Sequence, residues 1–294
     1  MLRKTAEPHR TAHAMSGQYA WRKLSAAKWE DAWLERLSEF IDRLAITALA
    51  GRKTIRLEVF EITKAQARRL EKAFGGEIAE MKKAHALAAM PPRPPIKVRK
   101  KLVVVATERE RAELATAMAG RKILLIPAGM AFGTGDHATT ATCLRFLADV
   151  SDEYAGRPWE VLDLGCGSGI LALAARMLGA RRAEAGDFDP DAVRVAKENA
   201  RLNGLKGVAV KRLDVRGWKA PRAWDVVVAN IYSGILVEVA PTIAGAVSPG
   251  GRLVFSGILR EQEAEVLAAF RKAGLRIDRI VRKTKWVTGL ATRV

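Results

Sequence analysis

The chain has 294 residues, 49% of them hydrophobic, and a formal charge of +18 at pH 7. This length suits two domains, and the apolar fraction excludes a wholly disordered chain. There is no run of ~20 apolar residues that would predict a membrane span. Four histidines and two cysteines (Cys143 and Cys166) occur without ligand spacing, so we expect no metal site and no disulfide framework. A reducing cytoplasm is the expected compartment.

The positive charge is concentrated in the first half of the chain. Residues 1–130 hold 26 Lys and Arg against 14 Asp and Glu, whereas residues 131–294 hold 24 against 18. The densest stretch runs without an acid from Met81 and contains Lys82, Lys83, Arg93, Lys97, Arg99, Lys100 and Lys101. Such a field favours a polyanion such as RNA, but a solvated basic face is an equal alternative because charge alone does not specify a ligand.

The first 90 residues predict a tail and a small domain. Residues 1–18 read as a flexible basic tail without the apolar core of a signal peptide. Residues 19–90 predict a small α+β domain. Its expected elements are a helix with apolar spacing from Trp29 to Leu49, a strand at 54–60 (TIRLEVF), and a helix capped by Thr63 that ends at Gly75-Gly76.

Residues 91–130 are expected to form a proline-rich linker and a connecting segment. Prolines 91, 92, 94 and 95 cannot continue a helix and predict a stiff chain. Within this segment the patterns predict a strand at 101–106, a helix at 108–118 and a strand at 122–126.

From Trp159 onward, strands and helices alternate, which is typical of a parallel α/β sheet. The strand VLDLG runs into a glycine-rich loop and the helix 170–178. Further strands are expected at 183–187, 208–212, 225–230, 251–256, 276–281 and 286–292, and further helices at 190–203, 235–246 and 261–273.

The strongest local motif is Asp163-Leu-Gly165-Cys-Gly167-Ser-Gly169, at a strand-to-helix junction. Glycines let a backbone approach a ligand closely, and a helix N-terminus offers free N–H groups. The spacing differs from the G-x-G-x-x-G fingerprint of dinucleotide-binding proteins. Asp187 ends the next strand, where it can accept hydrogen bonds from ribose hydroxyls. The alternative is a packing turn with a helix-capping acid.

This motif resembles the first motif of class I methyltransferases, which use S-adenosylmethionine (SAM). The resemblance implies a Rossmann-like class I methyltransferase sheet at 131–294, beside the smaller N-terminal α+β domain. It also implies that the methionine end of SAM lies over the loop, that Asp187 binds the ribose, and that Asp214 reads the adenine amine. Asp189 is expected to cap a helix with Pro190 in its first turn. The cofactor-binding residues expected here are Asp163, Gly165, Cys166, Gly167, Asp187, Phe188 and Asp214.

Three further segments resemble the ribosomal protein L11 methyltransferase family. They are AFGTGDHATTATCL at 131–144, VVANIYSGILVEVAP at 227–241 and SGILREQEAEVLAAF at 256–270. With the motif segments GCGSGILALAA and GDFDPDAV, the resemblance covers residues 95–294. It implies that Thr140 contacts SAM, that Asn230 is the polar residue ending the fourth strand and belongs to the cofactor-binding residues, and that a loop covers SAM with Phe132, Gly133, Thr134, Gly135 and His137.

Asn230, His137 and Tyr232 are the candidate catalytic residues. The Asn230 carbonyl can accept a hydrogen bond from an incoming amine and aim its lone pair at the sulfonium methyl, a transfer in which positioning lowers much of the barrier. His137 or bulk water can take the amine proton, although a structural role is the alternative for a single loop histidine. Tyr232 can stack on a base or form the wall of a lysine channel, and as a departure from the family's small aliphatic residue it leaves the substrate open.

Other departures also concern the substrate. Asp136 and Ala138 stand where the family usually has Thr and Pro. The front domain, which grips the protein substrate in that family, carries no motif that matches it. The cofactor is therefore better supported than the acceptor.

Together these patterns predict an enzyme that transfers a methyl group from SAM to lysine or N-terminal amines of a protein such as ribosomal protein L11. We expect a further contact with rRNA through the basic N-terminal half. The alternative is a nucleic-acid (RNA) N-methyltransferase, favoured by that charge and by a distant likeness of 230–233 to the Asn-Pro-Pro-Tyr motif. A catalytically silent SAM-binding or RNA-binding protein and a small-molecule methyltransferase are the remaining alternatives.

Overall fold

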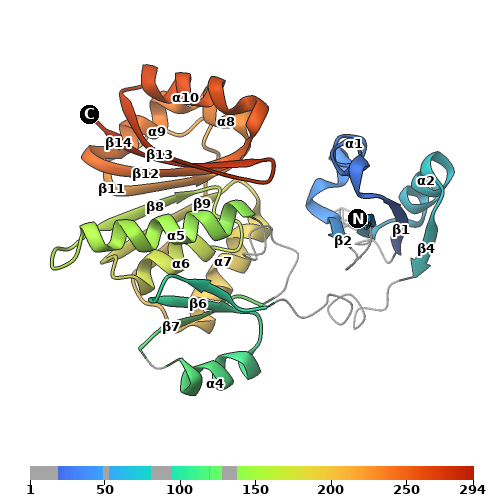
Figure 1. The fold of residues 1–294 in the computed structure, drawn as a ribbon, viewed down its shortest axis with the longest axis horizontal. Coiled ribbons are helices and arrows are strands. Elements are labelled where there is room, and N and C mark those ends of the chain that lie inside the picture. The colour runs from blue at the N-terminus through green and yellow to red at the C-terminus, as the bar shows by residue number, and fades with distance from the viewer. Residues whose placement is uncertain (1–18, 49–52, 81–93, 119, 128–137) are drawn as a thin grey trace, which may run out of the picture. The chain divides into compact units, whose positions relative to one another are not determined.

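The computed structural model describes residues 19–48, 53–80, 94–118, 120–127 and 138–294. The chain divides into two compact units, Met1–Pro91 and Pro92–Val294, and each is described by itself (Figure 1). The expected tail at 1–18 lies outside the described residues, as do the first three residues of the proline-rich stretch.

The first unit contains a four-stranded antiparallel sheet in the order β2-β3-β1-β4. Since β1 and β2 both pair antiparallel to β3, they run in the same direction with β3 between them, a split β-α-β arrangement. The aromatic rings of Trp21, Trp33 and Phe74 contact one another in its core. The elements are β1 (Tyr19–Ala26), η1 (Ala27–Trp29), α1 (Glu30–Arg36), η2 (Ser38–Arg43), β2 (Leu44–Ala48), β3 (Thr54–Ile62), α2 (Lys64–Phe74) and β4 (Glu77–Glu80).

Two local predictions in this unit have different outcomes. The cap at Thr63 is confirmed: its hydroxyl accepts from the Gln66 N–H at 3.2 Å, and the Gln66 side chain accepts from the Thr63 N–H at 2.9 Å. The prediction of a single helix from Trp29 to Leu49 is wrong, because this segment forms α1, η2 and then strand β2. Pairing of β2 with β3 overrides the helical spacing, as tertiary contacts often do for β-branched and aromatic segments.

The second unit is built on a seven-stranded sheet in the order β10-β9-β8-β11-β12-β14-β13. The first five strands in that order are parallel, and β14 is antiparallel to both of its neighbours. The expected α/β class is therefore confirmed. The strands are β8 (Glu160–Leu164), β9 (Arg182–Asp187), β10 (Val208–Arg212), β11 (Trp224–Asn230), β12 (Val247–Leu259), β13 (Leu275–Lys283) and β14 (Trp286–Arg293).

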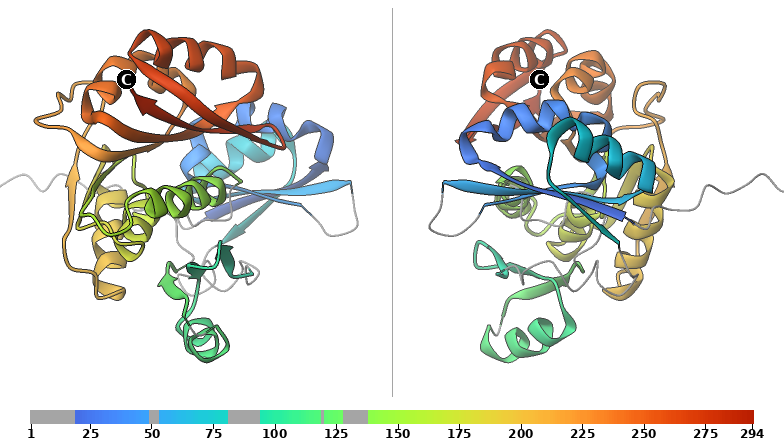
Figure 2. Two further views of the ribbon diagram at one scale, coloured as in Figure 1. Left: turned by 60° about the vertical axis from the view of Figure 1, so that its left-hand side comes forward. Right: turned by 90° about the vertical axis from the view of Figure 1, so that its right-hand side faces the viewer.

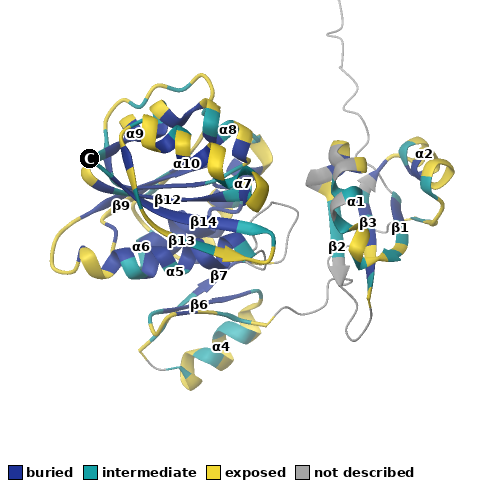
Figure 3. Ribbon diagram, turned by 45° about the horizontal axis from the view of Figure 1, so that its top comes forward, coloured by how far each residue is buried: buried dark blue, intermediate teal, exposed yellow. Residues whose placement is uncertain are grey.

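Helices cover both faces of this sheet (Figures 1 and 2). Along β11, Val226 and Val228 pack on the side of α5 and α6, whereas Val227 packs on the side of α8, α9 and α10. Figure 3 accordingly shows the central strands buried and the outer helix faces exposed. The helices are α5 (Ala138–Glu153), α6 (Ile170–Met177), α7 (Pro190–Leu202), α8 (Ser233–Glu238), α9 (Ala240–Ala246), η3 (Arg260–Gln262) and α10 (Glu263–Lys272).

Two helical features differ from expectation. The helix expected at 235–246 is divided at Val239, because Pro241 lies in the first turn of α9 and has no N–H to donate to the preceding turn. Helix α5 was not predicted, because Thr139, Thr140 and Thr142 are weak helix formers. Burial of these three side chains beside the sheet stabilises the helix nonetheless.

The segment expected to connect the domains belongs to the second unit. It forms a small sheet in the order β5-β6-β7, with β5 (Ile96–Val98), β6 (Leu102–Val105) and β7 (Lys122–Leu125), and helix α4 (Glu108–Ala117). Apolar side chains of this sheet share one buried cluster with α5 and α6. Hydrophobic burial therefore joins residues 96–126 of the expected connecting segment to the core of the second unit.

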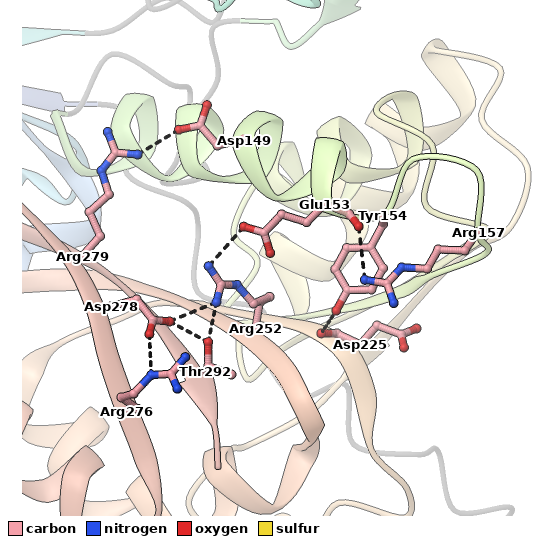
Figure 4. Close-up of polar contacts among 10 residues, drawn as sticks. All are labelled: Asp149, Glu153, Tyr154, Arg157, Asp225, Arg252, Arg276, Asp278, Arg279 and Thr292. Carbon is pink, nitrogen blue, oxygen red and sulfur yellow. Dashed lines mark hydrogen bonds and ion pairs between the residues drawn. The ribbon is translucent and has the colours of Figure 1, made fainter.

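Ion pairs fasten α5 to the sheet edge formed by β12, β13 and β14 (Figure 4). Arg252 lies 3.1 Å from Glu153 of α5 and 3.0 Å from Asp278 of β13, which also accepts from Thr292 at 2.6 Å. Arg279 reaches Asp149 of α5 at 3.1 Å. These contacts hold in place the helix that carries Thr140.

Two cations of the basic stretch are engaged within this unit. Arg99 forms an ion pair with Asp149 at 2.6 Å, and Lys101 forms one with Asp152 at 2.5 Å. Lys97 and Lys100 are exposed. In the part of the chain that the structure describes, no helix is long and apolar enough to cross a membrane, and no group of three or more His, Cys, Asp or Glu could hold a metal ion.

Candidate functional site

The glycine loop joins β8 to α6 and has a backbone that only glycine adopts readily. Gly165, Gly167 and Gly169 have φ values of +70°, +52° and +79°. The N–H groups of Gly165 and Cys166 both donate to the Gly186 carbonyl, at 2.8 and 3.1 Å. A methyl group at position 165 would lie 2.2 Å from a side-chain carbon of Ile231. The motif therefore builds a tight turn against two neighbouring strands.

Asp163 is the penultimate residue of β8, just before this loop, and is 1% exposed. Its Oδ2 accepts from the Ala172 N–H at 3.1 Å, while its buried Oδ1 has no hydrogen-bond partner among the described residues. Burial raises the pKa of Asp163 to about 7, against the Ala172 hydrogen bond that lowers it, and the charge of Asp187 raises it further. A buried carboxyl group of this kind can bind a cation.

Asp187 ends the neighbouring strand β9 and holds the loop from the side. Its Oδ2 accepts from the Gly167 N–H at 2.9 Å, and its Oδ1 accepts from the Asp189 N–H at 3.1 Å. Phe188, which follows, is 69% exposed. As predicted, Asp189 caps α7, accepting from the Asp191 N–H at 2.8 Å with Pro190 in the first turn.

Asp214 lies on an exposed turn after β10. Its carboxylate accepts from the Arg216 N–H at 3.0 Å, and the preceding Leu213 N–H donates to the Asp187 carbonyl at 2.8 Å. The two acids therefore follow neighbouring strands at one edge of the sheet.

A small pocket opens where α5, the glycine loop and β11 meet. Five of its lining residues were predicted from the sequence, namely Thr140, Gly165, Cys166, Gly167 and Asn230. Ile170 and Leu171 of α6 complete it and were missed, because apolar residues after a glycine motif read as core positions. The structure does not place Asp163, Asp187, Phe188, Asp214 or Tyr232 in the lining of this pocket.

Asn230 ends β11 at the wall of the pocket. Its Nδ2 donates to the Thr140 hydroxyl at 3.4 Å, and its buried Oδ1 has no hydrogen-bond partner in the described parts of the chain. The following residue, Ile231, lies so close to Gly257 that a methyl group there would be 2.2 Å from the Ile231 carbonyl oxygen. The backbone of Asn230 is therefore held tightly.

Tyr232 precedes α8, and its side chain is 62% exposed. Its carbonyl accepts from the Ile235 N–H at 3.0 Å, which begins the helix. The residues predicted to form the SAM-covering loop all lie outside the described residues, namely Phe132, Gly133, Thr134, Gly135 and His137. That loop leads directly into Ala138, the first residue of α5.

Comparisons with known proteins agree on one family. A family model described as ribosomal protein L11 methyltransferase (PrmA) matches residues 29–293. The match therefore reaches into the first unit, further than the motifs at 95–294 indicated.

Individual relatives carry the same description. The ribosomal protein L11 methyltransferase of Chromohalobacter salexigens is 46% identical over 193 residues, 66% of this chain and 61% of that protein. The one of Azotobacter vinelandii is 50% identical over 150 residues, 51% of this chain and 50% of that protein. The chain thus spans about half to three fifths of the length of the curated relatives it matches.

A solved structure supports the fold. The crystal structure of ribosomal protein L11 methylase from Lactobacillus delbrueckii subsp. bulgaricus has a TM-score of 0.59 and 29% identity, covering 68% of this chain and 99% of that one. With the family model and the strand order, this confirms the resemblance stated above: the chain belongs to the ribosomal protein L11 methyltransferase family.

Proposed function

We propose that the chain is a SAM-dependent N-methyltransferase acting on lysine or N-terminal amines of a ribosomal protein, with ribosomal protein L11 as the favoured substrate. Family membership supports the activity. The observation that carries it is a pair of buried side-chain oxygens, Asp163 Oδ1 and Asn230 Oδ1, without partners among the described residues. They belong to the neighbouring parallel strands β8 and β11.

The residues present fit SAM at this place. Asp163 offers a buried carboxyl oxygen to the ammonium of the methionine end, and the glycine loop leaves room for a close backbone approach. Asp187 offers its carboxylate to ribose hydroxyls, and Phe188 and Asp214 lie at the same sheet edge for the adenine. Bound there, SAM supplies an electrophilic methyl group. We propose that Phe132, Gly133, Thr134, Gly135 and His137 cover it.

Asn230 then holds the acceptor. Its Oδ1 accepts an N–H from a neutral amine and so points the nitrogen lone pair at the methyl carbon. The amine would lose its proton to His137 or to water as it accepts the methyl group. The exposed ring of Tyr232 lies two residues beyond Asn230 and forms one wall of the amine's path. No covalent intermediate with the protein is required.

We also propose that the enzyme acts in the cytoplasm and touches rRNA beside its protein substrate. The two cysteines are unpaired and buried, which suits a reducing compartment. The exposed Lys97 and Lys100 support an rRNA contact, whereas the internal ion pairs of Arg99 and Lys101 weaken it. RNA as the methylated substrate is less favoured, since the family is described by a protein substrate.

The test is incubation of the purified chain with methyl-labelled SAM and intact ribosomes, followed by separate counting of protein and RNA. We expect label in one small ribosomal protein, at lysine or the N-terminal amine by mass spectrometry. Label confined to RNA would instead support the alternative nucleic-acid methyltransferase. An Asp187→Ala variant is the blank for SAM-dependent transfer.

A further inference from the structure

Thr140 occupies a buried position on the first turn of α5, at the wall of the pocket. Its side chain is fully buried, and its hydroxyl oxygen lies 3.4 Å from Asn230 Nδ2. We propose that Thr140 is a positioning residue for Asn230. Its hydroxyl accepts the amide N–H, so that the Asn230 carbonyl oxygen faces the pocket. This inference rests on the proposed function, in which that oxygen receives the acceptor amine.

The backbone leaves Asn230 few other conformations. Asn230 of β11 pairs with Ser256 of β12. The next residue, Ile231, lies so close to Gly165 and to Gly257 that neither glycine could carry a methyl group. The remaining freedom is rotation of the terminal amide about its broad, two-fold torsion. A half-turn exchanges the two ends of the amide, one of which donates and one of which accepts.

The chemistry of the pocket requires one of these two orientations. An amine donor and a positively charged sulfonium both favour the carbonyl oxygen, whereas the amide NH2 would repel them. In the favourable orientation the Nδ2–H points at Thr140 and needs an acceptor, because a buried donor without a partner is costly. A hydroxyl supplies that acceptor, and a methyl group in its place does not.

Thr140 can perform this role because its helix is fixed. Ion pairs from Arg252 and Arg279 of the sheet edge hold the C-terminal half of α5 (Figure 4). Near its start, Thr142 donates to the Ala138 carbonyl at 2.7 Å, which satisfies a different hydroxyl of the same turn. The resemblance alone assigns Thr140 to SAM, whereas this geometry assigns its hydroxyl to the Asn230 amide.

The decisive experiment compares Thr140→Val, which keeps the shape and loses the hydroxyl, with Thr140→Ser, which keeps the hydroxyl. In methyl transfer to ribosomal protein we expect Thr140→Val to lower kcat about tenfold, the effect of one lost neutral hydrogen bond. The SAM Kd, measured by calorimetry, should stay within about twofold. Thr140→Ser should restore most of kcat. The double variant Thr140→Val/Asn230→Ala should be no slower than Asn230→Ala alone.

Thr142→Val is the matched control, because it removes a hydroxyl from the same turn without touching Asn230. We expect its kcat to equal that of the unmodified chain, and thermal unfolding checks that all variants are folded. Normal turnover by Thr140→Val overturns the inference, as does a loss explained entirely by weaker SAM binding. If the unmodified chain transfers no methyl group to ribosomal protein, the proposed function fails first, so the two failures are distinguishable.

Discussion

A carboxyl group buried beneath a glycine loop makes Asp163 sensitive to pH. Burial raises its folded-state pKa to about 7, from the ordinary aspartate value of 3.8. Between these two values the folded state holds the proton more tightly, so the free energy of unfolding falls as the pH rises from about 4 to about 7. The full loss is on the order of 4 kcal/mol. Ionised Asp163 therefore destabilises the protein without SAM, and a cation bound at this carboxylate would offset that destabilisation.

The matched variant is Asp163→Asn, which does not titrate. We expect its stability relative to the unmodified chain to be greater at pH 8 than at pH 5, because ionisation of Asp163 up to a pH of about 7 destabilises only the unmodified chain. Urea unfolding without SAM at both pH values measures the difference. Parallel stability curves for the two proteins would contradict the assigned pKa. SAM binding by the variant should be weaker because the ammonium loses its charged partner.

Asp187 and Asp189 make a second contrast between neighbouring acids. Asp187→Ala removes the carboxylate that accepts from Gly167 and faces the proposed ribose, so we expect SAM binding to be lost. Asp189→Ala removes only the cap of α7, which costs about 1 kcal/mol of stability and leaves SAM affinity unchanged. Calorimetry with SAM and thermal unfolding separate the two effects. Equal SAM affinity in the Asp187→Ala protein would refute the ribose assignment.

The sequence singles out candidate site residues but not the contacts between them. Asp163, Gly165 and Gly167 stand out because an acid followed by closely spaced glycines at a strand-to-helix junction suits the close approach of a ligand to the backbone. The contact between Thr140 and Asn230 joins residues 90 positions apart, and no local pattern indicates it. This contact becomes evident only once the fold places α5 beside the end of β11.

At the scale of elements, the end of β11 depends on glycines that let two strands approach. Gly257 has a φ of +86°, and a methyl group there would lie 2.2 Å from the Ile231 carbonyl oxygen. We expect Gly257→Ala to destabilise the protein by about 2–4 kcal/mol, through strain and a clash with backbone. It should also lower methyl transfer because Asn230 moves with Ile231. Denaturant unfolding and turnover measure the two effects.

Gly245 in α9 is the control for this substitution. Nothing lies within 4 Å of its added methyl group, and Gly→Ala in a helix is favourable by about 0.5–1 kcal/mol. Gly245→Ala should therefore leave activity unchanged and slightly raise stability. If Gly257→Ala and Gly245→Ala changed stability and activity equally, the close approach of Ile231 to Gly257 would not be what positions Asn230.

Element prediction succeeded where local signals and tertiary contacts agree. The strand–helix alternation after Trp159 and the cap at Thr63 are examples. It failed at α5, whose threonines oppose the helix locally, and at Leu44–Ala48, where pairing with β3 overrides apolar helical spacing. In both failures the stabilising partner lies far away in the sequence.

At the scale of the molecule, the small sheet β5-β6-β7 is fastened to the methyltransferase fold. Asn203, at the end of α7, accepts from the Leu125 N–H at 2.8 Å and donates to the Leu125 carbonyl at 2.7 Å. We expect Asn203→Ala to leave these buried groups unpaired, costing about 2–4 kcal/mol. Hydrogen exchange should speed up at β7 before it does at β11. Uniform acceleration across the second unit would contradict this local role.

In the proposed function, Asn230 positions the acceptor amine rather than SAM. The measurement that tests it most directly compares the unmodified chain with Asn230→Ala, using calorimetry for SAM binding and single-turnover methyl transfer to ribosomal protein. We predict a SAM Kd within about twofold and a transfer rate lower by about a hundredfold. Transfer at the unmodified rate would show that Asn230 does not hold the amine, and the account of the site would be wrong.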